Sequence, residues 1–261
     1  MPETIVLDVV DGVATLTLNQ PAKRNPLSAR MGEEIAQALG ALGAGDDARV
    51  LVLRGAGESF CAGGDLGLIE ARIADPATTR PREMLAFYDR YLSLMRLPIP
   101  TVAQVHGHAV GGGLALALAC DLRYAAEDAR LGVTFARLGL HPGLASTLTL
   151  PRIVGVSRAL ELFYTGRLVS GREAEALGLV TRAVPAPELS ATVEEVAGRI
   201  ARNAPLVVRM LKRAVYGSLE ESVAAALDYE AFAQAITYGS EDLREGLIAG
   251  RERREPRFRG R

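Results

Sequence analysis

The segment from Gly107 to Asp121, which reads GHAVGGGLALALACD, limits the possible folds of this chain more than any other. A β-rich run, Thr101 to Val105, precedes it, and an apolar run follows its three consecutive glycines. The stretch from Val110 to Cys120 has about half of the ~20 residues that a membrane-spanning helix needs. The segment therefore predicts a buried strand, a glycine turn and a buried helix, as in α/β proteins.

Strands and helices are expected to alternate over the first two-thirds of the chain. Thr4 to Val10 and Val13 to Leu18 flank Asp11-Gly12, a dipeptide that favours a two-residue hairpin turn. Ser28 can cap a helix, because apolar residues recur after it at helical spacing. Further elements are expected as strands at Val50–Leu53, Thr101–Val105, Asp121–Ala125 and Arg130–Thr134, and as a helix at Arg80–Leu97 before Pro98.

Beyond about Leu144 the pattern becomes mainly helical. Ser170 and Glu173 form the capping-box pattern of a helix start, and Leu179 to Val184 indicates a strand. The other helices are expected at Ser157–Tyr164, Glu188–Asn203, Pro205–Tyr216, Leu219–Tyr238 and Glu241–Arg251. The chain is therefore predicted to have an α/β core followed by a helical C-terminal region.

The charge balance argues against two classes of partner. The 261 residues include 30 basic and 31 acidic side chains, which gives a net charge of −1. A chain with this balance has no overall attraction to phosphate backbones or anionic lipid, so we expect neither nucleic acid nor a membrane as partner.

The cysteines indicate a reducing compartment. Cys61 and Cys120 cannot form a disulfide framework, and neither lies in a metal-binding pattern, so both are interpreted as small packing residues. The sequence MPETIVLDVVDG lacks the basic and apolar regions of an export signal. We therefore expect a cytoplasmic protein.

Two glycine-rich turns could hold an anion or a polarised oxygen. FCAGGDL, Phe60 to Leu66, follows one expected strand, and the glycines at 111–113 follow another and open a helix. Backbone N–H groups at a helix start lack partners and carry the positive end of the helix dipole, and glycine lets a ligand approach them closely. An equally simple interpretation is that Gly112 and Gly113 only let the helix pack tightly.

Other common chemistries lack their sequence patterns. The glycines at 107–113 do not fit the GxGxxG dinucleotide motif, and no GxxxxGK[ST] phosphate loop occurs. His106, His108 and His141 lack the spacing of zinc ligands, so no metal is predicted.

These turns belong to a longer series of motifs through which the chain resembles the crotonase, or enoyl-CoA hydratase/isomerase, family over essentially its whole length. The matching segments are NQPAKRNPLS, FCAGGDL, PTVAQVHGHAVGGGLALALACDLRYAAEDARLG, LGLHPG, LPRIVG, ALELFYTGRLVSGREAEALGLV and EGLIAGRERREPRFRGR. The resemblance implies an α/β fold with a ClpP-like ββα spiral core, residues 1–195, and a helical trimerisation region, residues 196–261. It also implies a homo-oligomer, a trimer or dimer of trimers, and an acyl-CoA thioester as substrate, with no separate cofactor.

The resemblance also assigns site residues. It implies an oxyanion hole formed by the backbone N–H groups of Gly64 and Gly112, which would hold the thioester oxygen as enolate charge develops. Phe258, in the tail, resembles a residue that reaches the nucleotide pocket of a neighbouring subunit, although a solvated basic tail is an equal alternative. The remaining substrate contacts are expected at Lys23, Arg24, Ala62, Asp65 and Leu66.

Two positions depart from the family pattern. The family's hydratases transfer protons with two glutamates, and the matching positions here hold Ala115 and Phe135, which instead suggest room for a bulky acyl group and an apolar wall. His141, in LHPG, is the first candidate for a substitute acid or base, although a structural role in the loop is the better interpretation. Tyr88 and Tyr91 could donate a proton but are better explained by core packing.

The sequence therefore predicts an acyl-CoA-binding enzyme that stabilises a thioester enolate with non-standard acid and base groups. Decarboxylation of a malonyl-type CoA thioester fits these residues, because it generates an enolate without a glutamate. The alternative from another class is a non-catalytic acyl-CoA-binding protein that keeps the pocket.

Overall fold

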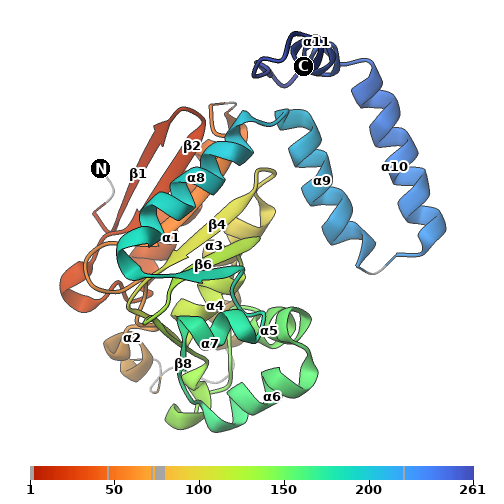
Figure 1. The fold of residues 1–261 in the computed structure, drawn as a ribbon. Coiled ribbons are helices and arrows are strands. Elements are labelled where there is room, and N and C mark those ends of the chain that lie inside the picture. The colour runs from red at the N-terminus through yellow and green to blue at the C-terminus, as the bar shows by residue number, and fades with distance from the viewer. Residues whose placement is uncertain (1–2, 46, 72, 74–79, 220) are drawn as a thin grey trace.

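A computed structural model describes residues 3–45, 47–71, 73, 80–219 and 221–261, which form an α/β body and an extended helical C-terminal part (Figure 1). The described residues include a six-stranded sheet in the order β1-β2-β3-β4-β6-β9 and a three-stranded sheet in the order β5-β7-β8. The strands are β1 (Ile5–Val10), β2 (Val13–Leu18), β3 (Val50–Gly55), β4 (Thr101–Val105), β5 (His108–Val110), β6 (Leu122–Ala126), β7 (Arg130–Gly132), β8 (Val169–Ser170) and β9 (Arg182–Val184). The predicted architecture is confirmed.

The N-terminal hairpin forms as the sequence predicts. Val10 pairs with Val13 in the antiparallel ladder of β1 and β2, and Asp11 and Gly12 between them have φ values of 50° and 79°. Two consecutive positive φ values are what a two-residue hairpin turn requires. The remaining neighbours in the large sheet, from β2 through β9, pair in parallel.

The centre of the large sheet is covered by helices. β3 and β4 are almost wholly buried, in keeping with their apolar runs. α8 (Leu189–Arg202) packs across β2, β3, β4 and β6, and the proposed domain boundary at residue 195 lies inside this helix. The Oγ of Ser28 accepts a hydrogen bond from the N–H of Met31, which confirms the predicted cap of α1 (Ala29–Ala44).

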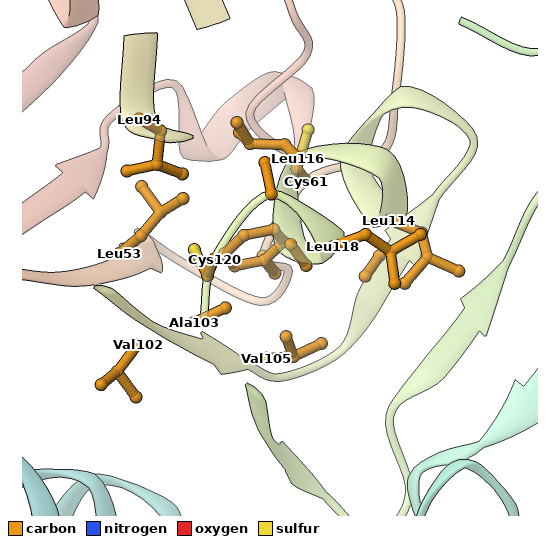
Figure 2. Packing of buried hydrophobic residues seen from close by; sticks show 14 of the residues in the cluster. Leu53, Cys61, Leu94, Val102, Ala103, Val105, Leu114, Leu116, Leu118 and Cys120 are labelled. Atoms are coloured by element: carbon orange, nitrogen blue, oxygen red, sulfur yellow. The ribbon is translucent and has the colours of Figure 1, made fainter. Parts of the chain in front are cut away.

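The segment around the three glycines forms the predicted strand, turn and buried helix. β4 ends at Val105, β5 joins the smaller sheet, and every residue of α4 (Gly112–Leu118) is buried. Figure 2 shows leucines of α4 among residues of β3 and β4, together with Cys61 and Cys120. Both cysteines are buried free thiols, and burial raises the pKa of each to about 12, which suits packing rather than reactivity.

Several element boundaries differ from the prediction. The helix expected to reach Leu97 is an α-helix, α3 (Arg80–Leu92), followed by a 3₁₀ turn (Ser93–Arg96), and α5 (Ser146–Val154) was not expected. The helix expected from Leu219 starts at Val223, capped by Ser222. The other helices are α2 (Leu66–Ala71), α6 (Val156–Thr165), α7 (Gly171–Ala176), α9 (Pro205–Ser218), α10 (Val223–Tyr238) and α11 (Glu241–Glu252).

We call residues 203–261, which contain α9, α10, α11 and the tail, the C-terminal arm. Figure 1 shows it in blue, extending away from the α/β body. Lys212 of α9 is bonded to the body, because its Nζ lies 2.9 Å from Oδ2 of Asp121 and donates to the carbonyl oxygen of Ile99 at 2.9 Å. The Tyr216 hydroxyl donates to the other Asp121 oxygen at 2.8 Å. One partly buried carboxylate therefore fastens α9 to the body.

We predict that Lys212→Met destabilises the protein by about 3 kcal/mol, because it leaves the carboxylate of Asp121 without its counter-charge. The pair is largely shielded from water, with side-chain exposures of 10% for Lys212 and 18% for Asp121. Urea unfolding at fixed protein concentration measures the loss. Lys23→Met is the matched control, since Lys23 is exposed and should tolerate the change. Equal stability of the two variants would contradict the anchoring role.

Candidate active site

Three segments distant in sequence meet in one backbone network. The N–H of Leu27 donates to the carbonyl oxygen of Gly63 at 2.8 Å, and the N–H of Ala62 donates to that of Arg24 at 2.9 Å. On the other side, the N–H of Val110 donates to the carbonyl oxygen of Cys61 at 3.1 Å. The glycine turn at 60–65 is therefore held between the loop that precedes α1 and the strand that leads into α4.

Asn25 locks the first of these segments in place. It is fully buried, its Oδ1 accepts from the N–H of Gln20, and its Nδ2 donates to the carbonyl oxygens of Ala56 and Ser59. Asn25 has a φ of 53°, a left-handed conformation that asparagine tolerates better than most residues. The amide thus fixes the loop to the chain just before the glycine turn.

The network brings the two glycine turns together. A Cβ built on Gly112 would lie 3.8 Å from the backbone nitrogen of Gly64, and one built on Gly63 would lie 3.5 Å from that of Gly112. Within the described part of the chain, neither Gly64 nor Gly112 uses its N–H in a hydrogen bond. Gly64 is exposed, whereas Gly112 is buried at the start of α4.

Neither Gly113 nor Gly112 has room for a side chain. A Cβ on Gly113 would lie 2.2 Å from the carbonyl oxygen of Cys61, so this glycine permits the close packing of α4 against the 60–65 turn. A Cβ on Gly112 would meet Cδ1 of Leu27 at 2.9 Å, beside the free amide of Gly64. The packing interpretation therefore holds for both glycines, and Gly112 in addition lies beside the free N–H of Gly64.

The walls around the two amides are apolar. Cδ1 of Ile69 lies 3.1 Å from the Cβ position of Gly64, and Cδ1 of Leu144 lies 3.6 Å from that of Gly112. Cζ of Phe135 lies 4.0 Å from the Cβ position of Gly111, the residue before α4. Such surroundings lower the local dielectric and strengthen the attraction of the N–H groups for negative charge.

Ala115 and Phe135, the positions at which the resemblance expects glutamates, both lie near Gly111. Ala115 is fully buried one turn into α4, where its N–H donates to the carbonyl oxygen of Gly111 at 3.0 Å. Phe135 is partly buried and packs against the core. Neither side chain carries a group that can transfer a proton.

The expected substrate-contacting residues belong to the loop before α1 and to the 62–66 segment. Lys23, Arg24 and Ala62 are exposed. Asp65 caps α2, because its Oδ1 accepts from the N–H of Leu68 at 3.1 Å, and Leu66 is the first residue of that helix.

The candidate proton donors have structural partners. His141 is exposed, and its Nδ1 lies 2.8 Å from the carbonyl oxygen of Pro142, which assigns the hydrogen to Nδ1. The Tyr91 hydroxyl donates to the carbonyl oxygen of Ser28 at 2.7 Å, and burial raises its pKa above the usual range. Tyr91 is thus a core residue, whereas Tyr88 lies over Gly143, whose Cβ position is 2.5 Å from the phenol oxygen.

Phe258 lies elsewhere in the chain, packed on its own arm. Its ring is 3.6 Å from the Cβ position of Gly246, and its carbonyl oxygen accepts from Arg49 at 2.9 Å. The tail ends on the N-terminus of α11, where the carbonyl oxygen of Arg261 accepts from the N–H of Glu241. An open depression of about 780 Å³ beside this tail is lined by charged residues, including the ion pair of Arg254 with Glu245.

The sequence patterns did not point to Asn25 or Leu144, both of which lie at the two glycine turns. Asn25 carries a signal that could have been used, since a buried asparagine in a short loop is a common backbone tie. Leu144 carries no such sequence signal, because a leucine does not indicate a left-handed backbone conformation.

The chain is similar to known proteins over nearly its whole length. The sequence matches the model of the family described as Enoyl-CoA hydratase/isomerase over residues 8–261. The chain belongs to the enoyl-CoA hydratase/isomerase family. The expected crotonase α/β fold with C-terminal helices is therefore confirmed.

Relatives within the enoyl-CoA hydratase/isomerase family cover nearly the whole chain. A putative enoyl-CoA hydratase of Thermus thermophilus is 40% identical over 94% of this chain and 97% of its own length. A crotonyl-CoA hydratase of Syntrophomonas wolfei is 34% identical over 98% of both chains. The crystal structure of an enoyl-CoA hydratase from Bacillus anthracis superposes with a TM-score of 0.93 at 36% identity, covering 99% of this chain and 100% of that one.

The comparisons leave the compartment as a prediction. A relative from Bos taurus, 38% identical over 95% of this chain and 85% of its own length, is named as a mitochondrial protein. In the part of the chain that the structure describes, no helix has both the length and the apolar character needed to cross a bilayer.

We predict that Gly113→Ala destabilises this family member by about 1–3 kcal/mol or more, because the new methyl group would collide with the carbonyl oxygen of Cys61. Gly40→Ala is the matched control, since Gly40 is an exposed residue of α1 with open space at its Cβ position. That variant should gain about 0.5–1 kcal/mol. Urea unfolding compares the two, and a Gly113→Ala protein as stable as the wild type would refute the close packing.

Proposed function

We propose that this chain is an acyl-CoA enzyme that holds the thioester oxygen of its substrate between the backbone N–H groups of Gly64 and Gly112. The observation that carries the proposal is the convergence of two free amides from separate turns within an apolar wall. The relatives named as enoyl-CoA and crotonyl-CoA hydratases support a CoA thioester as the ligand. CoA is then part of the substrate and not a separate cofactor.

The two amides would act by stabilising negative charge. When Cα of the thioester gains an electron pair, charge moves onto the carbonyl oxygen, and fixed donors stabilise that enolate more than the neutral thioester. Removal of one such donor typically slows an enzyme by ~10² to 10³. Gly112 is buried and Gly64 is bound into the 24–27 loop, so both donors are oriented before the substrate arrives.

Proton transfer is where this chain differs from a standard hydratase. Ala115 and Phe135 occupy the positions at which the resemblance expects glutamates, so we propose that hydration is not its main reaction. Decarboxylation of a malonyl-type CoA thioester fits the residues better, because cleavage of the bond to CO₂ leaves its electron pair on Cα and requires no base. His141 remains the proposed acid for returning a proton to that carbon.

We predict that the wild-type protein hydrates crotonyl-CoA very slowly. Ala115→Glu combined with Phe135→Glu should raise the rate, since general acid and base groups contribute about 10² to 10⁴ each. The assay follows loss of the conjugated thioester absorbance. Ala115→Gln with Phe135→Gln is the matched control, because glutamine has the size of glutamate but cannot transfer a proton.

The same preparation is tested for decarboxylation of malonyl-CoA, which carries no branch at Cα. Turnover of this thioester supports the proposed reaction. Rapid hydration by the wild type that His141→Ala abolishes would contradict it and identify His141 as a substitute base. Tight binding of acyl-CoA without turnover of any substrate in the panel would show a non-catalytic binding protein instead.

We also propose that the protein is a homo-oligomer, a trimer or dimer of trimers, assembled through the C-terminal arm. None of the described residues of α9 or α10 is buried, although both helices are rich in apolar side chains. Isolated helices with this composition require a partner surface. The exposed apolar residues of the arm include Leu211, Val215, Leu219, Val223, Leu227, Phe232 and Tyr238. In such an assembly, Phe258 could reach the nucleotide pocket of a neighbouring subunit.

Sedimentation analysis should give three or six times the mass of one chain. Leu227→Glu with Phe232→Glu should lower that mass, because charge is introduced into the exposed apolar surface of α10. Val10→Glu serves as the control, since Val10 is 66% exposed on the N-terminal hairpin, outside the arm. A monomeric wild type would refute assembly through the arm.

A further inference from the structure

The loop beside the two amides contains an unusual turn. Leu144 and Ala145 have φ values of 53° and 54°, and the N–H of Ser146 donates to the carbonyl oxygen of Gly143 at 3.1 Å. Two consecutive left-handed residues in a tight turn are normally glycine or asparagine, because a Cβ disfavours this conformation. The chain therefore holds a leucine and an alanine in a strained backbone geometry.

Contacts on both sides of the turn maintain this geometry. The Ser146 hydroxyl donates to the carbonyl oxygen of Gly143 at 2.8 Å, and Thr149 donates to that of Ala145 from both its N–H and its hydroxyl. The Tyr88 phenol lies against Gly143. Strain of this kind persists only where the surroundings impose it, and such sites gather near functional groups.

The turn directs the Leu144 side chain toward the two amides. Leu144 is only 3% exposed, although it belongs to a loop whose neighbour His141 is exposed. Around the Cβ position of Gly112 lie Cδ1 of Leu27 at 2.9 Å, Cδ1 of Leu144 at 3.6 Å and the nitrogen of Gly64 at 3.8 Å. Leu144 and Leu27 therefore both lie against Gly112, close to the nitrogen of Gly64.

We propose that Leu144 is a specificity-determining residue that limits the size of the acyl group at the carbon next to the thioester carbonyl. The inference rests on the proposed function, since it takes the carbonyl oxygen to lie between Gly64 and Gly112. The carbon attached to that carbonyl then lies beside Leu144. Straight-chain acyl groups fit against the leucine, and a substituent at Cα collides with it.

Leu144→Ala tests the proposal through binding alone. Isothermal titration measures the dissociation constants of butyryl-CoA and isobutyryl-CoA, which have the same number of carbons and differ in branching at Cα. The wild type should prefer butyryl-CoA. Removal of the leucine side chain should shift the ratio of the two constants toward isobutyryl-CoA by about tenfold or more, the usual effect of a methyl-sized change in an apolar pocket.

Two further variants separate the side chain from the backbone. Ala145→Gly relieves the neighbouring left-handed residue without altering the wall, so its melting temperature should rise while its butyryl to isobutyryl ratio stays at the wild-type value. Leu144→Gly removes the wall and relieves the backbone together, so it should fold even if Leu144→Ala does not. Its ratio should move in the same direction as that of Leu144→Ala.

The outcomes separate this proposal from the proposed function. If Leu144→Gly and Leu144→Ala bind both thioesters with the wild-type ratio, Leu144 does not set specificity, whereas acyl-CoA binding itself stands. If Ala145→Gly shifts the ratio as much as the Leu144 variants do, turn geometry and not the leucine wall controls the fit, and the proposal is overturned. If the wild type binds neither thioester, the proposed function fails and this inference fails with it.

Discussion

The close approach of the 60–65 turn to the first turn of α4 is the contact on which the rest of the site depends. It exists because Gly113 has no Cβ, so that the carbonyl oxygen of Cys61 can lie where a methyl group would stand. The same approach sets the free N–H of Gly64 beside Gly112. A backbone donor placed in this way needs no side chain and keeps its orientation as long as the core stays packed. The absence of a Cβ at Gly113 therefore serves both the packing of α4 and the placement of the Gly64 donor.

The backbone that forms the two glycine turns and the side chains expected to transfer protons are separate features of this chain. The enoyl-CoA hydratase/isomerase family is evident over residues 8–261, and the two turns converge, while Ala115 and Phe135 add only apolar surface. An oxyanion site in a dry pocket can serve any reaction that places charge on a thioester oxygen. The side chains next to Gly64 and Gly112, those of Ile69, Leu27 and Leu144, are hydrocarbon, which is why we propose a reaction that needs no glutamate.

The sequence predicted those parts of the fold that local chemistry determines. The Asp11-Gly12 hairpin, the Ser28 cap and the glycine-led helix α4 follow from turn propensity, capping and periodicity. α5 escaped prediction because Pro151 lies inside it, which usually ends a helix. The left-handed Leu144 could not be predicted either, since its conformation comes from contacts with residues such as Thr149 and from the packing of Tyr88 on Gly143. Tertiary contacts thus set the features that local patterns do not encode.

The infrared spectrum of a bound acyl-CoA carrying ¹³C at its thioester carbonyl tests the central claim most directly. Two N–H donors aimed at that oxygen polarise the C=O bond. The account predicts that the labelled carbonyl band moves to lower frequency when the thioester passes from water into the saturated protein. A band that remains at its solution frequency, or moves to higher frequency, in the fully bound complex would show that Gly64 and Gly112 do not hold the oxygen.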